Sequence, residues 1–316
     1  MSLFRSVRSV AGASGDGAVD WTAVGDAAKA ATSPGSVEMD PDERAAYGTD
    51  VRDARNRVRA VGEIGFDLPE TVEIQHRHHW IDANVATFRR VMEPLEDATG
   101  VFPGVARKVN TGTMSVSLAF LARNVLGQYD PLLLADGDDH ALYFVRPNIQ
   151  RVAEGLDVEY ERFRRWIAFH EVTHAAEFGA APWLSEHLEA QVEQGIDALS
   201  AGTVDREAFR ELNATMTVVE GYAELLMDEA FDGEYADLRA KLEARRTGGS
   251  PLSKLMRRVL GLGMKRQQYE LGKEFFEAVA AERGVAGAGR VWDGPETLPT
   301  EDELEDPDAW LARVDG

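Results

Sequence analysis

Two histidines and a glutamate interrupt an apolar helical pattern between Arg164 and Leu184, in the stretch RRWIAFHEVTHAAEFGAAPWL. His170 and His174 are four residues apart, so on a helix both imidazoles project from the same face on successive turns. Imidazoles placed in this way can both reach one Zn²⁺ at about 2.0–2.1 Å. Glu171 lies beside that face, where its carboxylate can take a proton from a water molecule next to the metal. The H-E-x-x-H spacing therefore predicts zinc as cofactor, with His170 and His174 as ligands and Glu171 as the catalytic base.

A third protein ligand must come from elsewhere in the chain. A metzincin would continue the motif as H-x-x-G-x-x-H, but Glu177 and Ala180 stand at the glycine and histidine positions, which excludes that class. A later apolar stretch, VVEGYAELLMDEA, carries Glu220 and Glu224 four residues apart. A carboxylate in such surroundings is costly unless it is paired or bound to a metal. We therefore predict Glu220 as the third ligand and Glu224 as the acceptor for the N–H of a ligand histidine. Gly221, next to the predicted ligand, would let the motif helix and this later helix approach closely.

The alternatives to a metal site are structural. His170 and His174 can be core histidines with carbonyl partners, and Glu220 and Glu224 can form buried ion pairs with arginines. Each alternative accounts for one pair of residues, and both must hold together to replace the metal. We therefore favour zinc.

Other polar side chains are weaker candidates. The histidines of HRHHW could bind a metal, but positions i, i+2 and i+3 do not share one helix face, so a polar helix face is the favoured interpretation. His187, in PWLSEHL, could stabilise an oxyanion or replace Glu220 as ligand. Three further side chains, Tyr143, Tyr222 and Arg146, could donate a hydrogen bond to a tetrahedral intermediate. The three histidines of HRHHW are His76, His78 and His79.

The elements that must position these residues are mostly helices. Apolar periodicity and breaker residues predict a frayed start, six longer helices, and three or four shorter helices after Phe231. Between Leu126 and Ile149 two β-prone runs flank DGDD, which predicts a hairpin. Its second run, ALYFVRPNI, is suitably placed as an edge strand beside the motif helix, where a peptide could add as a further strand. The six helices are expected over Asp20–Ala31, Pro41–Gly62, Asp67–Gly100, Asp157–Phe178, Trp183–Ser200 and Asp205–Phe231.

This order of elements predicts a mainly α fold of the α+β type, with a small antiparallel sheet beside the catalytic helix. We expect a flexible N-terminus over residues 1–19 and a helical N-terminal subdomain over residues 20–125. Residues 126–316 would form the catalytic region, with its helical C-terminal part packed as one unit.

Charge and composition restrict the partners. The chain has 55 acidic and 34 basic residues, a net charge of −21, and only six of the basic residues are lysine. Such a surface repels nucleic acid and anionic lipid, and it is typical of proteins from a high-salt cytoplasm. With no cysteine, disulfides and thiolate metal sites are excluded. The absence of a long apolar run or signal-peptide pattern predicts a cytoplasmic protein. Nothing indicates the oligomeric state.

Taken together, several stretches resemble the zincin-2 family of zinc-dependent metalloprotease-like proteins. Members are also described as candidate hydrolases or as associated with deazaflavin-coenzyme biosynthesis. The resemblance covers roughly residues 10–316 and implies a mainly α-helical zincin-like fold. It implies zinc held by His170, His174 and Glu220, with Glu171 catalytic. EGYAE is similar to the third-ligand segment of Glu-type zincins, which favours Glu220 over Glu224. The stretches include YFVRPNI, FHEVTHAAEF, PWLSEHL, VVEGYAELLMD and LPTEDELEDPDAWLARV.

The expected function is therefore that of a zinc-dependent hydrolase, most simply a metallopeptidase that cleaves a peptide or a small amide. One alternative is a non-catalytic scaffold in which zinc joins two helices. Another is an amidase or esterase for small molecules that uses the same site. Substrate choice depends on cleft shape, which the sequence does not give.

Overall fold

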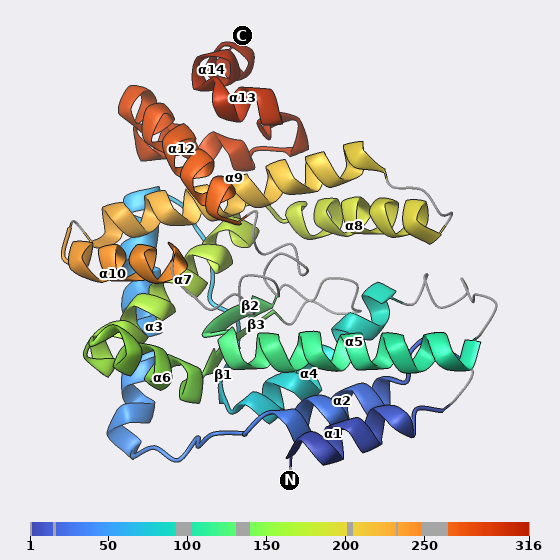
Figure 1. Ribbon diagram of the computed structural model, residues 1–316. Helices are drawn as coiled ribbons and strands as arrows, with labels where there is room; N and C mark the ends of the chain where they lie inside the picture. Colours follow the sequence, from blue (N-terminus) through green and yellow to red (C-terminus); the bar gives the residue numbers. More distant parts are fainter. Residues whose placement is uncertain are drawn as a thin grey trace.

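A small three-stranded sheet lies among helices near the centre of the chain's computed structural model (Figure 1). The structure describes residues 2–14, 17–92, 103–130, 140–200, 205–231, 233–247 and 265–315. Its strands are β1 (Thr71–Gln75), β2 (Gly127–Asp130) and β3 (Ala141–Val145). Its helices are α1 (Ser2–Ala11), α2 (Trp21–Ala31), α3 (Pro41–Gly62), α4 (Arg77–Met92), α5 (Pro103–Asn124), α6 (Arg146–Leu156), α7 (Tyr160–Ala180), α8 (Leu184–Ser200), α9 (Arg206–Phe231), α10 (Ala236–Thr247), α12 (Lys265–Ala288), α13 (Glu301–Glu305) and α14 (Pro307–Asp315), with 3₁₀ turns η2 (Gly289–Trp292) and η3 (Pro295–Thr297).

The sheet is mixed rather than antiparallel. β3 is the central strand; β2 pairs with it antiparallel, as the predicted hairpin requires, and β1 pairs with it parallel. The prediction of one helix over Asp67–Gly100 is wrong over β1. The run TVEIQ is rich in β-branched residues that alternate with polar ones. Its pairing with the buried strand β3 outweighs the helical pattern of the surrounding sequence. β3 is also shorter than predicted, because Pro147 fits the first turn of a helix and α6 begins at Arg146.

Two apolar cores hold the helices. The larger one joins α3, α7, α9 and α12 with the C-terminal turns, and it includes Phe163, Leu226 and Trp310. The smaller one joins α2, α4 and α5 around Trp80. In Figure 1 the helices of the smaller core lie on one side of the sheet, and α8, α9, α12, α13 and α14 lie on the other. The expected division into residues 20–125 and 126–316 stays a prediction, although α3 contributes to the larger core.

The chain start is more regular than expected. Residues Ser2–Ala11, predicted as frayed, form α1, which packs against α2. The helices predicted over Asp20–Ala31, Pro41–Gly62 and the later three ranges are confirmed to within a few residues. None of the described helices combines the length and apolar character of a membrane-spanning segment.

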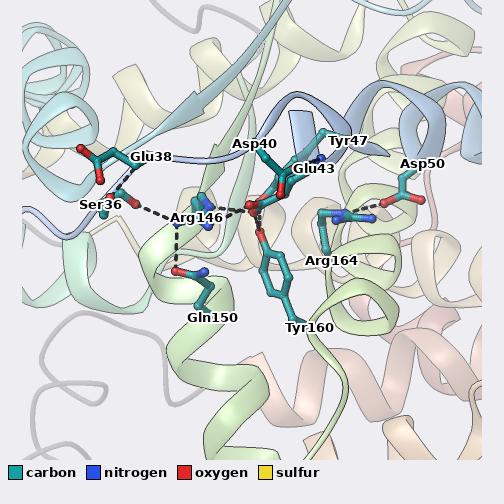
Figure 2. A network of polar contacts seen from close by, with 10 residues as sticks. All are labelled: Ser36, Glu38, Asp40, Glu43, Tyr47, Asp50, Arg146, Gln150, Tyr160 and Arg164. Carbon is teal, nitrogen blue, oxygen red and sulfur yellow. Dashed lines mark hydrogen bonds and ion pairs between the residues drawn. The ribbon is translucent and has the colours of Figure 1, made fainter. Parts of the chain in front are cut away.

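A network of polar side chains ties α3 to α6 and α7 (Figure 2). Glu43 of α3 accepts two hydrogen bonds from the Arg146 guanidinium, at 2.7 and 2.9 Å, and a third from the Tyr160 hydroxyl at 2.7 Å. The hydrogen bond from Arg146 lowers the pKa of Glu43. One turn further along α7, Arg164 donates to Asp50 of α3 at 2.8 Å. These contacts fix how α7 lies against α3, and they show that Arg146 serves the fold.

A glycine pair sets the distance between α9 and α12. A Cβ atom at Gly221 would lie 2.6 Å from the carbonyl carbon of Gly272, so only glycine permits this approach. The expectation that Gly221 lets α9 approach the motif helix α7 is wrong, because the helix in contact at Gly221 is α12.

Candidate metal centre

Helices α7 and α9 bring together the three residues expected to bind metal. His170 and His174 of α7 and Glu220 of α9 each offer a ligand atom, and these atoms all lie within 4.8 Å of one another. In the part of the chain that the structure describes, this is the one such group of three histidine or carboxylate side chains. A tetrahedral zinc ion with bonds of about 2.0–2.1 Å requires ligand atoms about 3.3 Å apart. The donor set fits zinc, and side-chain movements of about an ångström would close it.

Packing around α7 explains why these imidazoles are held. The helix is buried on most sides, so its apolar residues contact α3, α9 and the sheet. The Trp166 ring stacks parallel to the His170 ring, with centroids 5.7 Å apart. The His170 and His174 rings are 4.7 Å apart and meet at 77°. The two rings are therefore held edge to face by a core helix rather than by a loop.

A carboxylate that the sequence analysis did not assign lies behind one of the histidines. Glu177, fully buried, accepts a hydrogen bond from Nδ1 of His174 at 2.9 Å. Burial lowers the pKa of His174, but the charges of Glu177, Glu220 and Glu171 outweigh burial and raise that pKa to about 9. Burial also raises the pKa of Glu177 to about 7, against the opposing charge of His174. With Nδ1 engaged by Glu177, Nε2 is the nitrogen that would give up its proton to bind a metal.

Glu224 has a different partner from the one predicted. Its carboxylate pairs with the Arg239 guanidinium of α10 at 3.1 Å, and Arg239 also pairs with Asp228. For Glu224 the alternative of a buried ion pair therefore describes the structure, whereas Glu177 is the acceptor for the N–H of His174. The signal for Glu177 was available in the sequence, because i, i+3 spacing places it next to His174 on a helix.

The strand beside α7 is β2 rather than β3. The backbone N–H of Tyr129, on β2, donates to Oε2 of Glu171 at 2.9 Å. A Cβ atom at Gly127 would lie 2.5 Å from Oε1 of the same carboxylate. The expectation that ALYFVRPNI supplies the edge strand is wrong, because β3 lies between β1 and β2 and both of its edges are paired.

The remaining candidates lie outside the ligand group. His187 contacts Gln191 at 3.1 Å and meets the Trp183 ring edge-on, and burial lowers its pKa. The Tyr222 ring packs against Phe276 and Trp292, so it faces α12 rather than the histidines.

Tyr143, half-buried on the central strand, lies opposite Gln128 of β2 and Glu73 of β1. Burial raises its pKa.

HRHHW is a polar helix start, as favoured. The His76 ring stacks on His79 with centroids 3.8 Å apart, and Nδ1 of His76 accepts the backbone N–H of His79 at 3.0 Å, which caps α4. His78 bonds the carbonyl of Thr32 at 2.7 Å. The three imidazoles thus have local partners, and they do not form a metal-ligand group.

A cavity of about 230 Å³ opens between α7, α9, α10 and α12. Trp166 forms part of its wall, and because this side chain also stacks on His170, the cavity lies one side chain away from the ligand group. Besides Trp166 the lining combines small, apolar and aromatic residues with one carboxylate and two cations. These residues are Met227, Asp228, Phe231, Gly233, Tyr235, Ala236, Arg239 and Lys273.

A helix that carries H-E-x-x-H, an edge strand beside its glutamate and a carboxylate from a later helix together define the zincin class of metal-dependent hydrolases. The comparisons with known proteins agree. The family model for zincin-like metallopeptidases matches residues 19–205 and 195–311, and the chain belongs to that family.

A solved structure gives the same result for the fold. It is that of a candidate hydrolase with a novel fold from Chloroflexus aurantiacus, with a TM-score of 0.75 and 29% sequence identity. The match covers 99% of this chain and 98% of the other. The chain matched none of the curated proteins with which it was compared.

Proposed function

We propose that this protein is a zinc-dependent hydrolase that cleaves amide bonds, most simply those of peptides. The observation that carries the proposal is the convergence of His170, His174 and Glu220 from two helices, with Glu171 next in sequence to a ligand. Two neutral imidazoles and one carboxylate are the protein ligands of a catalytic zinc site, which keeps a further position open.

A zinc ion held there would lower the pKa of a water molecule and polarise the scissile carbonyl. The chain's own residues account for the other steps. Glu171 takes the proton of the attacking water and passes it to the leaving amine. Glu177 holds the His174 ring in the orientation that presents Nε2, and its negative charge makes the imidazole a stronger donor. Trp166 restricts the orientation of the His170 ring by stacking against it.

Two features support a peptide as the substrate. Among the strands that the structure describes, β2 is an edge strand whose outer edge runs beside Glu171, and an extended peptide can add to such an edge by backbone hydrogen bonds. The aromatic cavity beside Trp166 offers space for a substrate side chain near the reacting bond.

The test combines metal analysis with a digest of a peptide library, both in molar KCl because of the acidic surface. The wild-type protein should hold one zinc and cleave peptides. Glu171→Gln should retain the zinc and lose turnover, and Glu220→Ala should lose the zinc. Glu161→Gln, an exposed change on the same helix, is the matched control and should leave both properties intact.

The outcomes separate the alternatives. Stoichiometric zinc in Glu220→Ala would refute the ligand assignment. Zinc in the wild type with no cleavage of peptides, small amides or esters would favour the scaffold in which the metal only joins α7 to α9. Cleavage of small amides or esters but not peptides would favour the small-molecule hydrolase.

A further inference from the structure

The backbone of β2 faces two directions, and one of them is toward Glu171. In an antiparallel pair, alternate residues direct their N–H and C=O groups to the partner strand. The Val145 N–H donates to the Leu126 carbonyl, and Gln128 lies opposite Tyr143 in the same register. Gly127 and Tyr129 therefore turn their backbone groups to the other edge of β2, which pairs with no strand in the described part of the chain.

The carboxylate of Glu171 occupies one of these free-edge positions. Its Oε2 accepts the Tyr129 N–H at 2.9 Å, although the two residues are 42 positions apart in the chain. Glu171 itself is almost fully buried, so this N–H is a donor inside the protein rather than a surface contact. Hydrogen bonds to a charged acceptor are shorter and stronger than neutral ones, which suits the N–H to orient the carboxylate.

Gly127 provides the space that the carboxylate needs. A Cβ atom at this position would lie 2.5 Å from both Cγ and Oε1 of Glu171 and 2.7 Å from its Cδ. Gly127 does not have a positive φ angle, so its backbone conformation is open to any residue. The absence of a side chain is therefore explained by the neighbouring glutamate and not by the turn of the chain.

We propose that β2 positions the catalytic base: the Tyr129 N–H holds one oxygen of Glu171, and Gly127 leaves the clearance for that geometry. The inference rests on the proposed function and deepens it, because it assigns two positioning residues to the same site. A carboxylate has about four lone-pair sites, so accepting one N–H leaves it able to take the proton of a water.

The arrangement also affects how a peptide can add to the strand. Since Glu171 uses the Tyr129 N–H, an added peptide finds its ladder partners in the backbone groups of Gly127 and not in that N–H. The peptide's backbone is thereby placed next to the carboxylate that serves as base.

The first test uses stability and needs no activity. Gly127→Ala should lower the unfolding midpoint of the metal-free protein, because the added methyl displaces Glu171. In a Glu171→Ala background the atoms that it would meet are gone, and Gly127→Ala should then have no measurable effect. Gly65→Ala, where a Cβ would meet nothing within 4 Å, is the control for replacing a glycine. An equal loss of stability in both backgrounds would overturn the proposed contact.

The second test uses turnover. Gly127→Ala should reduce kcat at least tenfold with KM and zinc affinity nearly unchanged. Replacing Tyr129 by its α-hydroxy acid, which converts the N–H into an ester oxygen and keeps the phenol, should act in the same direction. The same replacement at Gln128 removes an N–H that faces β3, so it should reduce stability and leave kcat alone. Wild-type kcat in both the Gly127→Ala and the Tyr129 ester proteins would overturn the inference.

The two tests separate this inference from the proposed function. If the wild-type protein cleaves nothing, the proposed function fails, and the stability comparison still decides whether β2 holds Glu171. If the protein is active and the stability effect is the same with and without the Glu171 side chain, the function stands and the positioning role fails.

Discussion

Removing the carboxylate of Glu177 should weaken zinc binding without removing a ligand. Glu177 is fully buried and lies 2.9 Å from Nδ1 of His174, so it fixes the ring and leaves Nε2 to the metal. Loss of such a partner typically reduces metal affinity about 10- to 100-fold, which corresponds to about 1.4–2.7 kcal/mol. Glu177→Gln keeps an oxygen acceptor but loses the charge, so it should fall at the lower end, and Glu177→Ala at the upper end.

Competition with a chromophoric zinc chelator in molar KCl measures these affinities. Glu224→Gln is the matched control, because Glu224 is also a buried carboxylate near the site but pairs with Arg239. Its zinc affinity should equal that of the wild type. Wild-type affinity in Glu177→Ala, or equal losses in Glu177→Gln and Glu224→Gln, would show that the assignment of Glu177 is mistaken. Unfolding of each metal-free variant establishes that it is folded.

Two further predictions concern the scaffold. Gly221→Ala places a Cβ 2.6 Å from the Gly272 carbonyl carbon, so α9 and α12 must separate by roughly 0.8 Å. We expect the free energy of unfolding, measured with denaturant, to fall by about 1–3 kcal/mol. The control is Gly195→Ala, whose Cβ has only ordinary contacts and should cause no loss of stability. Glu43→Gln should cost about 3 kcal/mol at pH 7, because it leaves Arg146 largely buried without its partner. Since the pKa of Glu43 is lowered in the fold, its ionised form stabilises above pH 4.5, and this part of the difference from Glu43→Gln should shrink as unfolding is measured at lower pH.

The sequence was sufficient for the parts of the site that depend on local periodicity. The spacing of His170 and His174 requires only that α7 be a helix, and the apolar residues around them indicate one. The position of Glu220 was harder to predict from the sequence, because it depends on how α9 packs against α7. It could still be inferred, since a carboxylate in so apolar a helix needs a partner and the histidine pair needed a ligand.

The parts that could not be predicted depend on which elements become neighbours. β1 is five residues long, and its conformation is decided by pairing with β3, some 70 residues further along the chain. The ion pair of Glu224 has the same origin. Arg239 belongs to α10, and its proximity to Glu224 follows from a turn of the chain after α9 that no spacing rule gives.

The position of α9 links the metal site to the rest of the core. One face of this helix presents Glu220 to the histidines of α7, and the next residue, Gly221, about 100° further round the helix, lies against Gly272 of α12. A helix packed against two neighbours cannot shift relative to one without changing its packing against the other, because protein interiors are close-packed. The distances among His170, His174 and Glu220 therefore depend on a backbone contact that none of the three makes. By the same reasoning, the position of the Glu171 carboxylate depends on the place of β2, and α7, which carries Glu171 and the two histidines, is held by the ion pair of Arg164 with Asp50 on α3.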